Sequence, residues 1–257
     1  RCAPASQAPL RKALCCRRCP EAAVSDSDAA CRGVQSGTGA GDSPASAGRG
    51  LEMGVYAERV LPRIINVACG MKEARPLRER VCAGLHGDVV EIGFGTGHNV
   101  PYYPDTVKSV TAVEPSELSW KLASDRVSSS PVAIERSGLD GQALPFADDS
   151  FDTALSTWTL CTIPDAVAAL TEVRRVLRPG GALHFIEHGL APDDKVRRWQ
   201  YRLEPINKRM FGGCHLSRPI LDLLQNAGFT VKDVDVFYEK GAPRPMGADS
   251  LGVAVAP

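Results

Sequence analysis

Short apolar runs alternate with stretches of helical periodicity from about residue 88 onward. The apolar runs predict strands at residues 88–92, 109–114, 132–137, 151–157 and 182–187. Two of the intervening stretches, residues 117–127 and 165–177, are predicted helices, for which Ser116 and Asp165 are suitable N-caps. Alternation of strands and helices predicts a parallel sheet that is covered by helices on both faces.

The pattern changes toward the end of the chain. A helix is predicted at residues 219–227, followed by strands at residues 229–237 and 250–255 with no helix between them. Two strands that are joined without a helix pair most naturally as an antiparallel hairpin. The complete pattern therefore predicts an α/β sheet of seven strands, mostly parallel, with an antiparallel hairpin at its C-terminal edge.

Residues 55–85 precede the first strand and carry apolar side chains at helical spacing, with Gly70 and Pro76 as interruptions. This spacing predicts two short helices that pack on the sheet.

Residues 1–52 differ in composition from the rest of the chain. They are dominated by Ala, Gly, Ser, Pro and Arg, contain no aromatic residue and show no apolar periodicity. We expect them to form a disordered or non-native extension before a domain at residues 53–257. A transit peptide is the alternative, because the first twenty residues are basic, but Pro4 and Pro9 would break the amphipathic helix that it requires.

The end of the first predicted strand carries the most informative motif. Glu91 lies inside this strand, and Gly93, Gly95 and Gly97 follow at alternate positions. Such glycines let the backbone turn sharply and approach a ligand without Cβ atoms in the way. Glu114, at the end of the next strand, faces the same crevice and is placed to accept hydrogen bonds from both hydroxyls of a ribose. Together these features predict a nucleoside pocket.

The residues after the glycines argue against a dinucleotide. The dinucleotide motif requires Gly or Ala at its sixth position, where this chain has His98. Pro101 and Pro104 shorten any helix that follows, so its N-terminus would receive a pyrophosphate poorly. A ligand without phosphates fits better, and an NAD-binding oxidoreductase and a non-catalytic nucleoside-binding protein are kept as alternatives.

The order of motifs resembles that of class I S-adenosylmethionine-dependent methyltransferases. Residues 91–97 resemble motif I of these enzymes, and Glu114 matches their ribose-binding acid. Residues 144–152 and 173–181 are similar to the middle motifs of the methyltransferase type 11 group, which includes quinone-pathway and phospholipid methyltransferases. The resemblance covers residues 55–257 and implies a Rossmann-like fold and S-adenosylmethionine as cofactor.

A narrower similarity points to a membrane-associated methyltransferase-like subgroup known for methylating alkyl thiols. It is carried by residues 159–163, 185–188 and 211–218. The resemblance implies methyl transfer to a small, lipophilic acceptor, and a thiol is the favoured one. C- or O-methylation of a quinone precursor or phospholipid is the second interpretation.

The resemblance also implies which residues bind the cofactor. They lie on the glycine motif and at the ends of the following strands: Glu91, Gly93, Gly95, Gly97, Asn99, Glu114, Pro115, Asp140, Gly141 and Thr157. Asp140 and Gly141 occupy the place of the adenine-binding acid and small residue, although a solvated loop aspartate is the alternative for Asp140. In the family, residues 55–85 would help to cover the cofactor.

Three further residues are expected to face the acceptor at the carboxyl edge of the sheet, namely Trp158, Glu187 and His188. Glu187 and His188 are the best pair for accepting a thiol proton. The alternatives are an ordinary core position for Trp158 and a strand-capping role for His188. No catalytic residue is assigned, because transfer from a sulfonium depends mainly on alignment and on the exclusion of water.

Charge and cysteine content narrow the possible partners. Thirty basic and thirty acidic residues give a net charge of +0, which argues against general nucleic-acid binding. No metal site is expected, because Cys16 and Cys19 lack a second such pair and no histidine precedes His86. The scattered cysteines after residue 52 are typical of a reduced, cytoplasmic enzyme, with an organellar or membrane-surface location as the alternative.

Residues 190–217 interleave basic and aromatic side chains. This mixture predicts an amphipathic lid, a peripheral membrane contact or a solvated helix face. No apolar run of about 18 residues occurs, so no transmembrane helix is expected. The expected partner is a small-molecule acceptor, and no obligate protein partner is evident.

Overall fold

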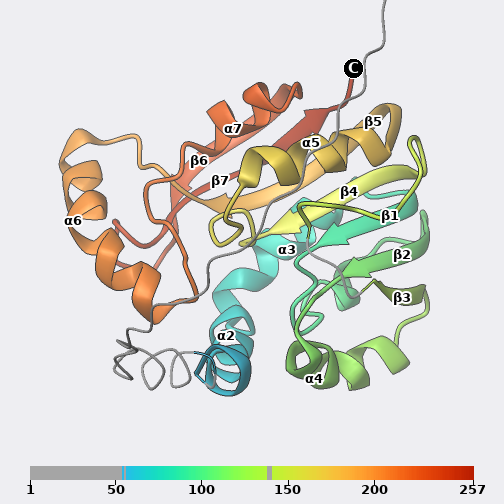
Figure 1. Ribbon diagram of the computed structural model, residues 1–257, viewed down its shortest axis with the longest axis horizontal. Coiled ribbons are helices and arrows are strands. Elements are labelled where there is room, and N and C mark those ends of the chain that lie inside the picture. Colours follow the sequence, from blue (N-terminus) through green and yellow to red (C-terminus); the bar gives the residue numbers. More distant parts are fainter. Residues whose placement is uncertain (1–53, 55, 138–140) are drawn as a thin grey trace, which may run out of the picture. The chain divides into compact units, whose positions relative to one another are not determined.

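The computed structural model describes residues 54, 56–137 and 141–257, so the predicted extension at residues 1–52 and Asp140 lie outside the described residues. One sheet organises the described chain (Figure 1). Its strands are β1 (Gly87–Ile92), β2 (Val107–Val113), β3 (Ala133–Ser137), β4 (Phe151–Thr157), β5 (Leu177–His188), β6 (Thr230–Tyr238) and β7 (Ala248–Val255). They are arranged in the order β3-β2-β1-β4-β5-β7-β6.

The strand directions confirm the predicted Rossmann-like fold. Strands β1 to β5 pair in parallel, whereas β7 is antiparallel to both of its neighbours, β5 and β6. In the register, Ile92 is paired with Val113 on one side and with Ser156 on the other. The carboxyl ends of β1, β2 and β4 therefore meet at one edge, where open α/β sheets bind ligands.

The helices also follow the sequence pattern. Their bounds are η1 (Tyr56–Val60, a π-helical turn), α2 (Leu61–Cys69), η2 (Lys72–Ala74), α3 (Arg75–Cys82), η3 (Val100–Tyr102), α4 (Glu117–Ser128), α5 (Ala166–Val176), α6 (Asp194–Met210) and α7 (Ile220–Asn226). Both predicted N-caps are confirmed, because Ser116 Oγ accepts from the Ser119 N–H and Asp165 Oδ1 accepts from the Ala168 N–H. Prolines do keep the helix after the glycine motif short, since η3 is a single 3₁₀ turn.

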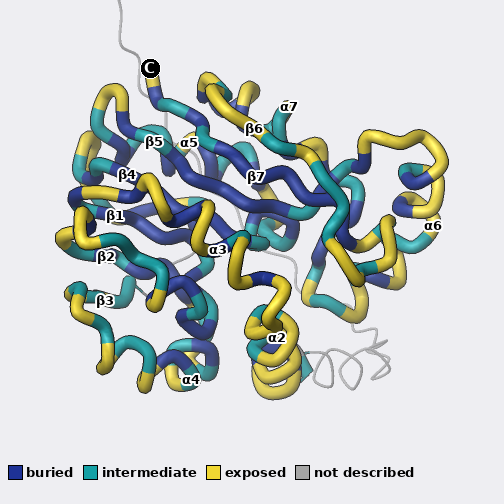
Figure 2. The backbone as a smooth tube through the Cα atoms, turned by 180° about the vertical axis from the view of Figure 1, so that it is seen from behind, coloured by how far each residue is buried: buried dark blue, intermediate teal, exposed yellow. Residues whose placement is uncertain are grey.

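Apolar side chains fill both faces of the sheet. Val90 packs in one cluster with Leu170 of α5 and Leu224 of α7, whereas Val89 packs in another with Val81 of α3. Side chains alternate between the faces of a strand, so both helical layers are anchored by the same strands. Each fully buried side chain of this kind contributes roughly 1.5–3 kcal/mol. Figure 2 shows the buried central strands between more exposed helices.

Helix α2 differs from the other helices of the N-terminal half. Its chain is largely exposed in Figure 2, and Ile64 and Val67 are 41% and 73% exposed. The expectation that its apolar residues pack on the sheet is therefore wrong for α2. It holds for Val81 on α3 and for Leu85 just after α3, which are buried against the strands.

Candidate functional site

The glycine loop follows β1 at the carboxyl edge of the sheet. The N–H groups of Gly93 and Phe94 donate to the carbonyl of Val113, which fixes the loop against the end of β2. Gly93 has a φ of 70°, and a Cβ there would collide with the side chain of Thr159. Gly95 has a φ of 59°, but the nearest atom to a Cβ there is the Gly93 oxygen at 3.8 Å. Gly93 thus permits close packing, and Gly95 leaves open space above the loop.

Glu114 is held rigidly beside this loop. Its Oε2 accepts from the Gly95 N–H and its Oε1 from the Ser116 N–H, both at 2.7 Å. Burial raises the pKa of Glu114, and these two hydrogen bonds oppose that rise. Each carboxylate oxygen has a further lone pair, so Glu114 retains the capacity to accept hydrogen bonds from a ligand.

Glu91 lies beneath the loop in a buried polar network. Asn99 Nδ2 donates to Glu91 Oε1 at 2.9 Å, and the Tyr103 hydroxyl donates to Oε2. Asn99 also donates to Thr157 Oγ1 at 3.0 Å and accepts from Arg78. Burial raises the pKa of Glu91 to about 7, although its hydrogen bonds oppose the shift. The network connects the ends of β1 and β4 with α3.

These elements enclose a cleft of about 500 Å³ at the sheet edge. It is lined by six of the predicted cofactor-binding residues, namely Gly93, Gly95, Glu114, Pro115, Gly141 and Thr157. Glu91 and Asn99 support the cleft from below without lining it. Gly97 does not line the cleft either. It packs against Phe94 and Ala123 of α4, and a Cβ at this position would press on both.

Helix α2 supplies one wall of the cleft, through Leu61, Ile65 and Cys69 among others. His98 fastens this helix to the glycine loop, since its Nε2 lies 2.9 Å from the carbonyl oxygen of Asn66. Burial lowers the pKa of His98 to about 4, so its ring is neutral and donates to that carbonyl at neutral pH. From the sequence, His98 indicates only that the motif is unfavourable for a dinucleotide. No local sequence pattern predicts its contact with Asn66 of α2.

Trp158 stands where the cleft meets a second cavity, and it lines both. Its φ of 50° is unusual for a bulky residue, and such strain costs of order 1–3 kcal/mol. Its backbone N–H donates to Ile186, its indole N–H donates to Asp249 at 3.4 Å, and the Arg78 guanidinium lies 4.8 Å from its ring centroid. These contacts hold the ring as a partition between the two spaces.

The second cavity has a volume of about 260 Å³ and shares four lining residues with the cleft: Ile65, Cys69, Trp158 and Thr162. Most of its lining surface is apolar, but four further polar residues also line it: His188, Asn207, Glu239 and Asp249. The rest of its wall comes from α2, η2, α6 and the segment after it, the loop after β4, and the ends of β5, β6 and β7. His188 lines this cavity, and its predicted role in facing the acceptor stays a prediction. Burial opposes protonation of His188, but the neighbouring Cys214 thiol raises its pKa.

Glu187 differs from its predicted position facing the acceptor. It is fully buried and does not line either space. Its Oε1 accepts from Ser156 Oγ at 2.7 Å and from the Thr159 N–H at 3.1 Å, so it fixes the loop after β4. Neighbouring side chains on a strand point to opposite faces, which explains why His188 reaches the cavity and Glu187 does not.

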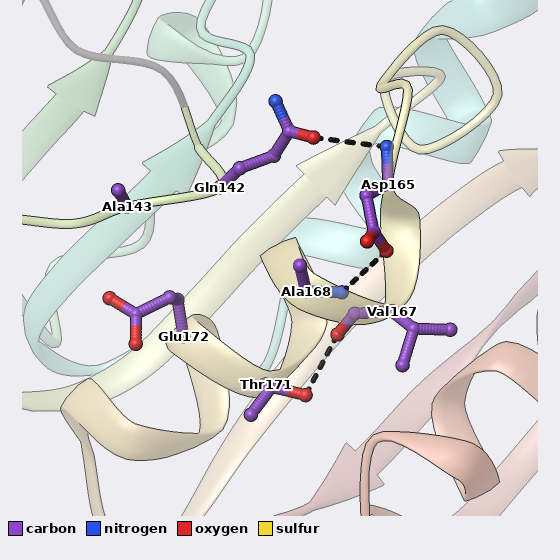
Figure 3. A pocket seen from close by; sticks show the side chains of 7 residues that line it. All are labelled: Gln142, Ala143, Asp165, Val167, Ala168, Thr171 and Glu172. Atoms are coloured by element: carbon purple, nitrogen blue, oxygen red, sulfur yellow. Dashed lines mark hydrogen bonds between the residues drawn. The ribbon is translucent and has the colours of Figure 1, made fainter.

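A third hollow lies on the surface beside α5 (Figure 3). None of its seven lining residues is buried, and its only hydrogen bonds drawn in Figure 3 are Gln142 with Asp165, the α5 cap at Asp165 and a bond of Thr171 within α5. It contains no residue of the glycine motif, so we do not assign it to the site.

The buried carboxyl of Glu91 predicts a pH dependence of stability. Its folded pKa of about 7 exceeds the ordinary 4.5, so the folded chain keeps a proton that the unfolded chain releases. Stability should therefore fall as the pH rises from 4.5 to about 7. Glu91→Gln removes this titration. Its amide oxygen can still accept from Asn99, and its amide N–H can donate to the Tyr103 hydroxyl. We expect the variant to be about 1–3 kcal/mol more stable than the wild type at pH 8, and equally stable near pH 4.5.

Urea unfolding at both pH values measures this difference. Glu135→Gln is the control, because Glu135 is an exposed glutamate on β3. A stability gap for Glu91→Gln that is the same at both pH values would show that folding does not raise the pKa of Glu91.

Comparisons with known proteins agree with this geometry. Residues 90–185 match the family described as a methyltransferase domain. The human thiol S-methyltransferase TMT1B is 34% identical over 184 residues, which are 67% of this chain and 72% of the relative. Human thiol S-methyltransferase TMT1A is 33% identical over 148 residues, which are 55% of this chain and 59% of the relative.

A solved structure gives the same result for the fold. The crystal structure of a SAM-dependent methyltransferase from Thermotoga maritima, described as a possible histamine N-methyltransferase, superposes with a TM-score of 0.58. It is 25% identical in sequence, and the match covers 80% of this chain and 100% of that protein.

Proposed function

Because this chain belongs to the S-adenosylmethionine-dependent methyltransferases, we propose that it transfers the methyl group of that donor to the sulfur of a small, lipophilic thiol. The relatives named thiol S-methyltransferases support this acceptor. The observation that carries the proposal is the largely apolar cavity that shares a wall with the nucleoside cleft. An oxidoreductase has no support from these relatives.

The cleft suits S-adenosylmethionine in chemistry and in size. Gly95 leaves space that a side chain would fill, and the fixed Glu114 carboxylate can accept from the ribose hydroxyls. Gly141 is buried against Ile92, with which a Cβ would be in close contact at 3.1 Å, and this supports a flat adenine lying beside it. Thr157 lines the cleft, and the next residue, Trp158, lines both the cleft and the second cavity. This supports placing the methionine end of the donor near these two residues.

When bound, the donor supplies an electrophilic methyl group on a positively charged sulfonium. Displacement on such a methyl needs a lone pair aligned opposite the leaving sulfur and little water nearby. Trp158 keeps the two spaces adjacent yet distinct, and α2 covers both from the solvent side. A thiol reacts as its thiolate. Even a thiol with the cysteine pKa of about 8.5 is only roughly a tenth ionised at pH 7.5, and a simple alkyl thiol is ionised less.

An acceptor screen with product identification tests the proposal. We expect alkyl thiols to be converted to methyl sulfides, and alcohols of equal chain length to react at least about tenfold more slowly, because they ionise far less readily. Mass spectrometry of products formed with isotopically labelled donor measures both rates. Faster methylation of a quinol or of phosphatidylethanolamine than of any thiol would contradict the proposed acceptor.

We also propose that α6 touches a membrane surface from the cytoplasmic side. Trp199, Ile206 and Met210 recur at helical spacing and are 54%, 60% and 51% exposed, and Arg202 lies over the Trp199 ring. This combination supports binding in the interface of an anionic bilayer. Among the described residues, no helix is both long enough and apolar enough to cross a bilayer.

Sedimentation with vesicles of phosphatidylcholine and phosphatidylserine tests this contact. Changing Trp199, Ile206 and Met210 together to serine should weaken vesicle binding by about tenfold or more. The control is Val234→Ser with Val236→Ser, which removes exposed apolar side chains from β6 instead. Equal binding by all three proteins would exclude α6 as the contact.

A further inference from the structure

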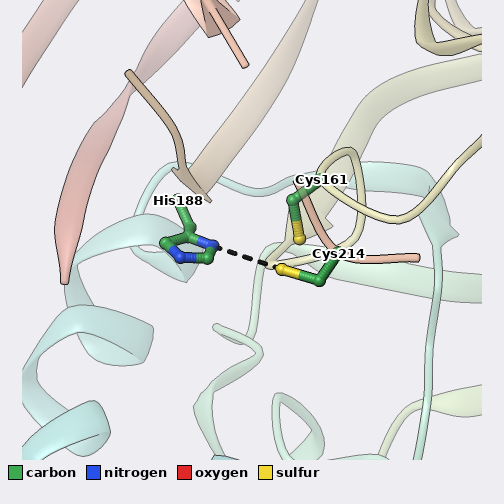
Figure 4. A group of neighbouring side chains, drawn as sticks. All are labelled: Cys161, His188 and Cys214. Atoms are coloured by element: carbon green, nitrogen blue, oxygen red, sulfur yellow. Dashed lines mark hydrogen bonds between the residues drawn. The ribbon is translucent and has the colours of Figure 1, made fainter. Parts of the chain in front are cut away.

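Three side chains that can bind a metal meet at the wall of the second cavity. Cys161 lies in the loop after β4, His188 ends β5, and Cys214 lies in the turn after α6. Figure 4 shows the three side chains pointing toward one another. The Cys214 sulfur lies 3.7 Å from His188 Nδ1, and the ligand atoms of all three residues are within 4.8 Å of one another.

These separations suit a tetrahedral zinc site. With Zn–S bonds of about 2.3 Å and Zn–N bonds of about 2.0–2.1 Å, neighbouring sulfur and nitrogen ligands are about 3.6 Å apart. Two thiolates and one imidazole are a donor set that favours zinc over harder cations. Among the described residues, no other group of three or more such side chains is close enough to hold a metal ion.

Hydrogen bonds to backbone groups hold the segments that carry these three side chains in place. The His215 N–H donates to the Cys161 carbonyl at 2.9 Å, which joins the two cysteine segments. Asn207, on α6, donates to the Cys214 carbonyl at 2.8 Å. Glu187 fixes the loop that carries Cys161, as described above. Because the three side chains are already held close together, little conformational entropy is lost when they bind an ion.

We propose that Cys161, His188 and Cys214 bind a zinc ion whose fourth coordination position opens into the second cavity. All three residues line that cavity, so an ion held by them has its free position on the cavity side. Three protein ligands with an open fourth position are the arrangement of catalytic rather than structural zinc. In the sequence, only the spacing of the cysteines near residue 16 suggests a metal site. Cys161, His188 and Cys214 are far apart in the chain and form no spacing motif that would have indicated this site.

The site gives the proposed thiol methylation, on which this step rests, a way to choose and activate its acceptor. An alkyl thiol that binds zinc loses its proton to solvent and becomes a thiolate near neutral pH. Its sulfur forms a bond to the donor methyl, while the bond from that methyl to the sulfonium breaks and its electron pair stays on the donor sulfur. The methyl sulfide product is uncharged and binds zinc weakly, so it leaves.

Metal binding by the full chain under reducing conditions tests the site. We expect the wild-type chain to bind about one zinc ion more than Cys161→Ala/Cys214→Ala, because the cysteines before residue 52 are the same in both. Cys82→Ala is the matched control, since it removes a fully buried cysteine outside the cluster and should bind as much zinc as the wild type. Equal zinc binding by the wild type and the double variant would overturn the proposal.

Cobalt gives a second measurement that does not need the double variant to fold. Co²⁺ added to the wild type should produce a thiolate charge-transfer band, and His188→Gln should weaken Co²⁺ binding at least about tenfold. An alkyl thiol should then intensify the band by occupying the open position, whereas an alcohol should not. A band that an alkyl thiol leaves unchanged would overturn the open site. If zinc-free protein methylated thiols, only the role of the metal in the reaction would be overturned. If the protein bound zinc but did not methylate thiols, only the proposed function would be contradicted.

Discussion

Gly93→Ala is expected to lower the free energy of unfolding by about 2–5 kcal/mol and to abolish donor binding. The φ of 70° at this position costs an L-residue roughly 1–2 kcal/mol. The added Cβ would also strike Thr159, and relieving such an overlap costs about 1–3 kcal/mol. Because Thr159 lines the cleft and directly follows Trp158, which lines both spaces, its displacement would deform both spaces.

Substitutions at two other glycines separate the cost of backbone strain from the cost of the contact with Thr159. Gly180 lies near the start of β5 and does not line the cleft. Its φ is 80°, and no atom lies within 4 Å of a Cβ there. Gly180→Ala should therefore cost only the strain and leave donor affinity unchanged. Gly95→Ala should cost a similar amount of stability but weaken donor binding at least about tenfold, because its Cβ would enter the ligand's space.

Urea unfolding and calorimetric titration with S-adenosylmethionine measure both quantities for the three variants. If Gly93→Ala were no less stable than Gly180→Ala, the contact with Thr159 would be unimportant. If Gly95→Ala bound the donor normally, the space above the loop would not be the donor's.

The sheet was predictable from the sequence because its signal is local. Strand β4 was predicted with its observed bounds, and the caps at Ser116 and Asp165 fixed the starts of α4 and α5. Each of these signals depends on side chains a few residues apart, where periodicity and capping act directly. The glycine motif was legible for the same reason.

The walls of the site were less predictable because they depend on contacts between distant residues. The apolar positions of α2 fit equally well a helix that packs on the sheet and one that covers a cleft. Contacts between distant residues, such as that of His98 with Asn66, distinguish the two arrangements. The meeting of Cys161 with Cys214 depends on how the segment after α6 returns to the sheet. No spacing rule encodes that return.

Glu114→Ala is expected to weaken the binding of S-adenosylmethionine by about 1.5–3 kcal/mol, or about 10- to 150-fold, the range for hydrogen bonds to a charged group. The control is Glu117→Ala, which removes a neighbouring carboxylate whose side chain is 86% exposed and paired with Arg136. Calorimetric titration of both variants measures the change. Unchanged affinity in Glu114→Ala would mean that this carboxylate does not hold the ribose.

A double-mutant cycle separates the ribose contact from the structural role of Glu114. The carboxylate also holds the N–H groups of Gly95 and Ser116, so its removal could loosen the loop without any direct contact with the ligand. S-adenosylhomocysteine and an analogue without its ribose hydroxyls should differ in affinity for the wild type but bind Glu114→Ala almost equally. If the variant still distinguished the two ligands as strongly as the wild type does, the hydroxyls would be recognised elsewhere, and the loss of affinity would belong to the loop.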